Sequence, residues 1–267
     1  MIFENYIIDA LFMQSKVFLN LVLIPLIVLF FSCNREAKRQ CKAIKNVKIN
    51  APISVTVGDL MTISAPEVGG FRIYNWDGPN FFDSQDPVNT IEEVGMRHRG
   101  TYKLHLYTLE DDACEVFDEV FVDVLLKQGN PDCSIDLNTT SFNNQGPNEY
   151  ISVIETIDAV TNQKTLTANG IAGTCVIYFH PSWNTQNIKT GIYKTTDNYS
   201  MDNADGDYNK VFIGITRNST FWGCVENQDV YVTNNDGNLK IEFCNLNFLA
   251  NNGSSLSAIV SGNIIEP

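Results

Sequence analysis

Beyond about residue 50 the chain consists of short runs in which apolar and polar residues alternate, separated by Gly, Pro, Asn and Asp. Alternation with a period of two is typical of strands with one buried face, and no long helical periodicity follows the first segment. The pattern therefore predicts an all-β fold. The clearest runs are ISVTV (53–57), LMTIS (60–64), TYKLHLYT (101–108), VFVDVLL (120–126), CVIYF (175–179), VFIGI (211–215), VYV (230–232) and LKIEF (239–243).

Two of these runs predict a hairpin. VYV (230–232) and LKIEF (239–243) flank Asp236-Gly237, a pair that favours the positive φ angles of a tight turn. A second break, Lys127-Gln128-Gly129-Asn130-Pro131-Asp132, has the composition of a linker. We therefore expect two β-sandwich domains, 49–126 and 133–267, joined by residues 127–132. Each is long enough to bury a core of its own.

The first segment has a different pattern. Val17–Phe31 is an apolar run of 15 residues, preceded by Lys16 and followed by Ser32-Cys33. The run is shorter than the roughly 20 residues that span a bilayer, and its layout is that of a signal peptide over residues 1–32. Residues 1–12 carry two acidic side chains and no Lys or Arg. Because such a leader should begin with positive charge, we expect translation to start at Met13.

The end of this leader, Phe30-Phe31-Ser32-Cys33, resembles the lipobox of Bacteroidetes lipoproteins. The resemblance implies that a lipid is attached to Cys33, that the leader is removed, and that the protein resides at the outer membrane. An ordinary secretion signal and an uncleaved anchor remain alternatives. In that group acidic residues after the cysteine accompany export to the surface, whereas basic residues follow Cys33. The periplasmic and the surface face of the membrane therefore both remain open.

Charge is unevenly distributed along the chain, whose net charge is −13. Residues 34–48 hold six Lys or Arg against Glu36, whereas residues 49–267 hold 11 Lys or Arg against 28 Asp or Glu. The segment 33–48 is expected to be a lipidated basic tether, which either holds an anionic membrane surface or is a solvated spacer. The acidic remainder argues against nucleic acid as a partner.

Six of the seven cysteines follow Cys33, and an even number in an exported chain favours disulfides. The division into domains suggests the pairings Cys41–Cys114, Cys133–Cys244 and Cys175–Cys224. No Cys-x-x-Cys occurs, and no histidine lies at zinc-ligand spacing from a cysteine. The sequence therefore predicts no cofactor.

Residues 49–126 resemble the Ig-like and PKD-like modules of bacterial surface proteins. The resemblance lies in Tyr74–Asn80, in Arg99-Gly100-Thr101-Tyr102 and in the strand Val120–Val124. It implies a sandwich with Trp76 in its core and a role as spacer, adhesin or ligand binder. Trp76, Phe81 and Phe82 could form a sugar-stacking platform, but burial is the commoner fate of aromatic residues. His105 alternates with Leu104 and Leu106 and should lie on the solvent face.

Residues 133–267 resemble an uncharacterised β-rich domain of Bacteroidetes lipoproteins, through Gly191–Thr196, Asp229–Thr233, Asp236–Asn245 and Ser261–Ile264. That family has no activity to transfer. Two sets of candidate ligand-binding residues lie in this domain. Trp183, Trp222 and Tyr193 could stack on sugars. Asp202, Asp205 and Asp207, with Asp197, could bind Ca²⁺, although the EF-hand register fails and an acidic hairpin loop is the favoured interpretation.

Catalytic motifs are absent from the sequence: it contains no Gly-x-Ser-x-Gly, no His-Glu-x-x-His and no phosphate-binding glycine loop. We therefore expect a non-catalytic, lipid-anchored envelope protein that acts as a binding or structural module of the adhesion type. The alternative is a carbohydrate-binding accessory lipoprotein, and a hydrolase is a remote one. The expected partners are the membrane, through the lipid anchor, and another envelope protein or a glycan.

Overall fold

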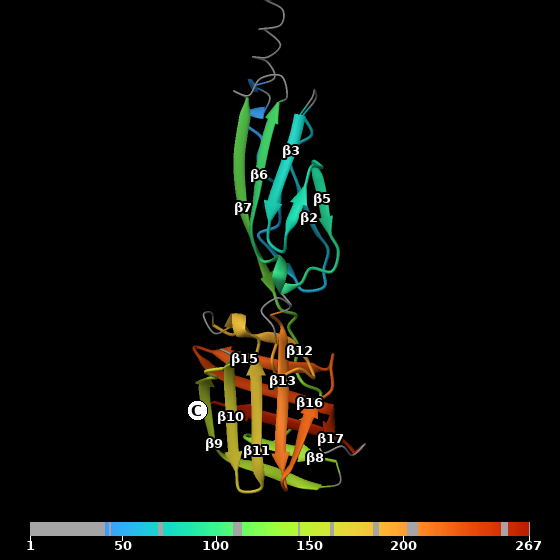
Figure 1. The fold of residues 1–267 in the computed structure, drawn as a ribbon, viewed down its shortest axis with the longest axis vertical. Helices are drawn as coiled ribbons and strands as arrows, with labels where there is room; N and C mark the ends of the chain where they lie inside the picture. The colour runs from blue at the N-terminus through green and yellow to red at the C-terminus, as the bar shows by residue number, and fades with distance from the viewer. Residues whose placement is uncertain are drawn as a thin grey trace, which may run out of the picture. The chain divides into compact units, whose positions relative to one another are not determined.

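The computed structural model describes residues 41–266 except 43, 69–71, 109–113, 144, 161–162, 184–186, 202–207 and 252–255. Strands make up most of the described chain, so the predicted all-β class is confirmed (Figure 1). Strands β1–β7 fall in residues 54–125 and β8–β17 in residues 139–265, and the two groups form separate sheets. No helix among the described residues is both long and apolar enough to cross a bilayer.

No strand lies between residues 125 and 139, where the linker 127–132 is predicted. The contacts within the chain divide it differently from the predicted domains: residues 52–62 and 90–100 are grouped with 121–267 in one compact unit. The domain boundary therefore stays a prediction, and each group of strands is described by itself.

The N-terminal strands form a five-stranded sheet in the order β1-β7-β6-β3-β4 and a two-stranded sheet β2-β5. β1 runs parallel to β7, and β3 pairs antiparallel with β6 and with β4. This arrangement is that of an Ig-like sandwich. Its elements are β1 (Ser54–Thr56), β2 (Met61–Ser64), β3 (Arg72–Gly78), β4 (Phe82–Ser84), β5 (Val88–Ile91), the 3₁₀ turn η1 (Met96–His98), β6 (Gly100–Thr108) and β7 (Glu115–Leu125).

Trp76 on β3 is fully buried, opposite Leu104 on β6. Its indole Nε1 donates a hydrogen bond to the backbone oxygen of Asp86 at 2.8 Å, so the one polar group of the side chain is satisfied inside the core. The expected core role of Trp76 is confirmed. Phe81 is instead fully exposed and Phe82 is half-buried, so these three residues form no common platform.

Tyr102 on β6 is also fully buried, and burial raises the pKa of its hydroxyl to about 12. The ring packs edge-on against Phe82, with 5.3 Å between centroids. It leaves no room for a side chain on the neighbouring strand, because a Cβ at Gly78 would lie 2.6 Å from the Tyr102 ring. Gly78 is thus required for this close approach of strand and ring.

The C-terminal strands form one sheet that closes on itself. Its order is β11-β10-β9-β8-β17-β16-β14-β13, and β13 pairs back with β11 over seven residues. β12 runs parallel to β13, and β15 joins β12 to β16. The elements are β8 (Thr139–Phe142), β9 (Gln145–Ile157), β10 (Lys164–Gly170), β11 (Gly173–Phe179), the 3₁₀ turn η2 (Pro181–Trp183), β12 (Gly191–Thr195), β13 (Lys210–Arg217), β14 (Thr220–Cys224), β15 (Asp229–Asn235), β16 (Asn238–Ala250) and β17 (Ser257–Ile265).

Closure refines the expected sandwich, because the walls of the C-terminal core belong to one continuous eight-stranded cylinder. An interior of this size is just wide enough to be filled by side chains. Alternate residues of each strand fill it, among them Ile177, Phe179, Ile213 and Phe243, all fully buried. Cys175 lies in phase with Ile177 and is equally buried, so its predicted inward direction is confirmed.

The predicted hairpin is present as β15–β16, with Asn235 opposite Asn238. Asp236 and Gly237 form the two-residue turn with φ angles of 55° and 105°. Two consecutive positive φ angles match the right-handed twist of the flanking strands, which explains why this pair of residues is suited to the turn.

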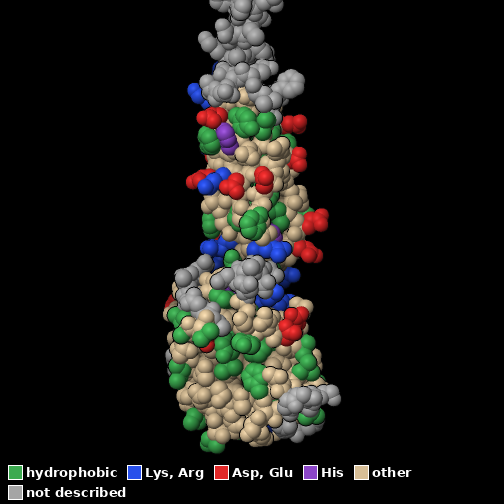
Figure 2. Space-filling view, in the orientation of Figure 1, with side chains coloured by type: hydrophobic (Ala, Val, Ile, Leu, Met, Phe, Trp, Pro, Cys, Tyr) green, Lys and Arg blue, Asp and Glu red, His purple; other side chains and the backbone are tan. Residues whose placement is uncertain are grey.

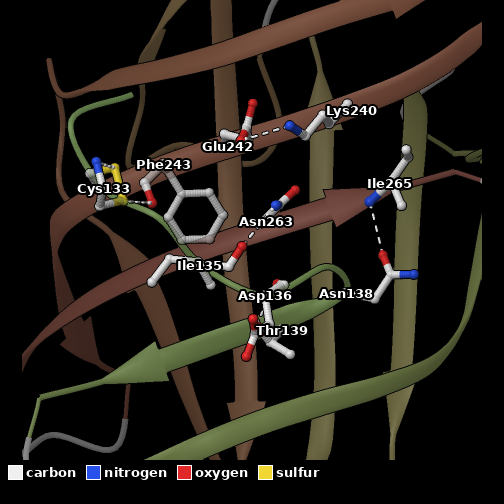
Figure 3. A network of polar contacts seen from close by, with 11 residues as sticks. Cys133, Ile135, Asp136, Asn138, Thr139, Lys240, Glu242, Phe243, Asn263 and Ile265 are labelled. Carbon is white, nitrogen blue, oxygen red and sulfur yellow. Dashed lines mark hydrogen bonds and ion pairs between the residues drawn. A yellow bond between two sulfur atoms is a disulfide. The ribbon is translucent and has the colours of Figure 1, made fainter. Parts of the chain in front are cut away.

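The segment that leads into β8 is fastened along β16 and β17 (Figure 3). A disulfide joins Cys133 to Cys244. The Asn263 amide donates to the Ile135 oxygen at 3.0 Å, and the Ile265 amide donates to Asn138 Oδ1 at 2.9 Å. In this segment, which forms no strand, side-chain amides thus provide hydrogen-bond partners for backbone groups that strand pairing would otherwise satisfy.

Candidate functional site

The structure contains two of the three disulfides that the sequence favours, Cys41–Cys114 and Cys133–Cys244. The third differs, because Cys175 and Cys224 are buried free thiols. β13 lies between β11, which carries Cys175, and β14, which carries Cys224. The Cα atoms of the two cysteines are therefore two strand spacings apart, each about 4.8 Å. Together these spacings exceed the Cα separation of about 7 Å that a disulfide tolerates. The expected Cys175–Cys224 bridge is therefore wrong.

The aromatic residues expected to bind sugar do not form an exposed row. Trp183 and Tyr193 are buried, with exposed fractions of 2% and 0%. The Trp183 indole donates to the Tyr208 oxygen, and the Tyr193 hydroxyl donates to the Lys189 oxygen at 2.9 Å. Trp222 is half-buried and packs edge-on against Phe142. These side chains serve the core, so the expected stacking site at these positions is wrong.

Two other expected sites lie outside the described residues. The first is Cys33, the expected lipidation site, and the second is formed by the candidate Ca²⁺ ligands Asp202, Asp205 and Asp207. Within the described chain, no three His, Cys, Asp or Glu side chains are grouped so that they could hold a metal ion.

The strongest candidate site is the outward face of β3, β6 and β7 in the N-terminal sheet. Phe117 on β7 is 65% exposed, and its ring stacks on His105 of β6 with centroids 4.1 Å apart and planes at 12°. Tyr107 extends the cluster, with 4.9 Å between its centroid and that of His105. Figure 2 shows hydrophobic side chains gathered beside a histidine, with acidic side chains around them. An exposed stack of rings of this kind is typical of an interaction surface.

A groove of about 540 Å³ adjoins the stack. It is formed by side chains from three neighbouring strands, since β3 and β7 both flank β6. The lining consists of Asn75, Asp77, Lys103, Leu104, His105, Phe117, Asp118 and Glu119. A hollow of this size is large enough to receive a side chain or two of a partner.

Carboxylates dominate the charge of this groove, with Asp77, Asp118 and Glu119 against Lys103. Burial raises the pKa of Asp118, but hydrogen bonds from Lys48 Nζ (2.7 Å) and the Ile49 amide (2.8 Å) outweigh it, so the pKa lies below its ordinary value. Asp118 is therefore ionised at neutral pH. His105 Nε2 lies 3.0 Å from Glu115 Oε2, which fixes the imidazole in the stack.

An exposed aromatic stack with charged side chains around a groove is an arrangement suited to binding. Phe117, which is not among the candidate residues predicted from the sequence, is the exposed apolar residue of the lining, since Leu104 is buried. Its position in the strand could have indicated this exposure. In β7 every second residue faces the same side, and Phe117 shares its side with exposed Glu115, Glu119 and Phe121, whereas buried Val122 and Val124 face the other side.

Comparison with known proteins identifies no family: no family model matches the sequence, and no curated protein matches it. Among solved structures, murine CEACAM1b is 11% identical with a TM-score of 0.27, and the match covers 83% of this chain and 99% of that chain. The eight N-terminal Ig domains of Down Syndrome Cell Adhesion Molecule are 12% identical with a TM-score of 0.25, covering 82% and 26%. At these values the likeness says nothing about what this chain binds.

Proposed function

We propose that this chain is a non-catalytic binding protein of the cell envelope, which holds a protein partner against the outward face of β3, β6 and β7. The observation that carries the proposal is the stack of Phe117 on His105 beside the 540 Å³ groove. Aromatic residues are enriched in the buried centres of protein interfaces, and truncating one at such a centre costs about 2 kcal/mol or more of binding free energy.

The charge of the face selects among partners. Carboxylates surround the aromatic stack, so a complementary partner presents basic side chains around an apolar group. A second copy of this chain would bring like charges together, which costs free energy. We therefore infer a different protein, with a basic rim, as the partner.

The same proposal includes a lipid anchor on Cys33 at the outer membrane, with the leader removed and a basic tether after it. Its support is in the sequence: a short apolar run that ends at a cysteine, followed by six Lys or Arg against Glu36. A basic tether adds attraction to anionic headgroups, about 1 kcal/mol for each basic residue near the surface.

The expected extent of that tether, 33–48, is too long. Cys41 is bonded to Cys114, Ile44 and Val47 are buried, and Lys48 pairs with Asp118, so residues from Cys41 onward belong to the folded domain.

The binding face is tested with two matched variants, Phe117→Ala and Phe81→Ala. Phe81 is fully exposed in the same sandwich but lies outside the groove. Each protein is immobilised, and retention of envelope proteins is quantified by mass spectrometry. We expect Phe117→Ala to weaken retention of a wild-type partner by about 30-fold, and Phe81→Ala to leave it unchanged. Equal retention by wild type and Phe117→Ala contradicts the proposed face.

The anchor is tested separately with Cys33→Ala. We expect wild-type protein to incorporate labelled fatty acid and to fractionate with membranes, and the variant to lose the label. Label retained in Cys33→Ala, or a wild-type mass without lipid, contradicts the anchor and leaves the binding face untouched.

A further inference from the structure

A second groove, of about 550 Å³, lies on the outer wall of the C-terminal cylinder. Strands β13, β14 and β16 form its floor, because β14 pairs with β13 on one side and with β16 on the other. Its size is within the range of small-molecule sites. The lining residues are Asp197, Tyr199, Phe212, Phe221, Gly223, Cys224, Val225, Glu226, Leu249, Ala250 and Asn251.

Two facing glycines lie beneath this groove, and one of them, Gly223, belongs to its lining. Gly214 on β13 faces Gly223 on β14. The Phe212 and Phe221 rings lie over Gly214, where a Cβ would be 2.6 Å from Phe221. Gly223 is not closely covered, since a Cβ there would have its nearest neighbour, Phe212, at 3.6 Å. The open space of the groove therefore begins at Gly223.

Aromatic rings line one side. Phe212 and Phe221 are nearly parallel, with planes at 17° and centroids 6.4 Å apart. Tyr199 meets Phe212 edge-on at 6.2 Å and lies 6.4 Å from Tyr178, which itself contacts Phe212 at 6.1 Å. Phe212 is buried at the base, whereas Tyr199 is 57% exposed. The rings thus extend from the floor of the groove to its rim.

The charge in this groove has one sign. Its charged lining residues are Asp197 and Glu226, and no Lys, Arg or His belongs to the described lining. An anionic ligand such as a phosphate is disfavoured here, and a cation is attracted.

Aromatic faces together with carboxylates form the environment that binds alkylammonium groups, through the ring quadrupole and through direct charge attraction. We propose that this groove binds a small organic cation that carries an alkylammonium group, with its charge between Asp197 and Glu226 and its methyl or methylene groups against Phe212 and Phe221. This site is independent of the N-terminal face, so either proposal can fail alone.

The test is calorimetric titration of the purified chain with choline and with 3,3-dimethyl-1-butanol, a neutral molecule of nearly the same shape. We expect choline to bind with a Kd of about 1 mM or tighter and the neutral alcohol to bind at least about tenfold more weakly. Lysine in an acetylated, amidated form is titrated as well, to separate a free cation from a peptide side chain. Tighter binding of this lysine than of choline overturns the assignment to a free ligand.

Gly223→Val is designed to fill the groove without disturbing the strand. A Cβ at Gly223 meets only ordinary contacts, and valine suits a strand better than glycine does. Gly146→Val is the matched control, since a Cβ at Gly146 on β9 would meet nothing within 4 Å and this residue is outside the groove. We expect Gly223→Val to abolish choline binding while its melting temperature is maintained, and Gly146→Val to bind as wild type does.

A double variant, Asp197→Asn with Glu226→Gln, tests the charge without altering shape. We expect it to weaken choline binding by about tenfold or more and to leave binding of the neutral alcohol unchanged. It also serves if Gly223→Val fails to fold. The proposal is overturned if choline produces no heat, if the neutral alcohol binds as tightly, or if folded Gly223→Val or the double variant binds choline as wild type does.

Discussion

The two buried thiols lead to a prediction that discriminates between the expected and the observed cysteine pairing. Cys175 and Cys224 are free in the structure, whereas the other four described cysteines are in disulfides. The test is to treat the oxidised protein with iodoacetamide, first in its folded state and then in denaturant, without reductant in either step. We expect the folded protein to resist alkylation at both positions.

The magnitude follows from the burial of the thiols, because the thiolate is the form that reacts. Burial raises the pKa of Cys224 from 9.0 to about 12. At pH 8 this lowers the thiolate fraction from about 10% to about 0.01%, a change of about a thousandfold. Burial, and then the neighbouring Cys224, also raise the pKa of Cys175. Labelling should therefore depend on opening of the structure.

Intact-mass analysis after alkylation gives the readout. We expect no label on Cys175 or Cys224 in the folded protein and both labels after denaturation. Because the chain has seven cysteines, a third label identifies an unmodified Cys33, and its absence agrees with lipidation. Denatured protein without label at Cys175 and Cys224 would show that they form the bridge expected from the sequence, and rapid labelling of both in the folded state would refute the argument from burial.

Two further predictions concern the N-terminal sandwich. Trp76→Ala should lower the free energy of unfolding by about 3–5 kcal/mol, because it removes a buried ring. Trp76→Phe keeps a ring and should cost about 1–2 kcal/mol, because the Asp86 oxygen that loses the indole donor still accepts from Asn89 at 3.0 Å. Urea unfolding followed by circular dichroism measures both, and equal effects contradict the assigned packing of the ring in the core. The lowered pKa of Asp118 means that its interaction with Lys48 stabilises the fold above its unfolded-state pKa near 3.8, and that this contribution is lost as pH falls through the folded-state value. Asp118→Asn should remove at most about 1 kcal/mol at pH 7 and reduce the acid sensitivity of unfolding, whereas an unchanged pH profile counts against the pairing.

The all-β class and the β15–β16 hairpin could be predicted because both depend on local sequence. Alternation decides which face of a strand is buried, and Asp236-Gly237 supplies the two positive φ angles of the turn. Trp76 could be placed in the core for a similar reason, since it lies on a strand whose alternate residues are apolar.

Closure of the C-terminal sheet could not be predicted, because it depends on which distant strands pair. Nothing in CVIYF or VFIGI states that β11 pairs with β13 as well as with β10. The mistaken Cys175–Cys224 bridge has the same origin. Both cysteines lie in one sheet, but whether a strand lies between them is a property of the order of its strands.

The candidate sites show where strand phase helps and where it does not. Phe117 lies on a strand, out of phase with buried Val122 and Val124, so its exposure follows from the alternation of β7. Trp183 lies in the 3₁₀ turn η2, where no alternation exists to indicate its direction, and it is buried. Phe212 departs from the pattern of alternation. It points outward from β13, but Tyr178 and Tyr199 cover it and it is buried. Its burial depends on contacts with residues far away in the sequence, and for that reason the aromatic groove on the C-terminal wall could be found only in the folded chain.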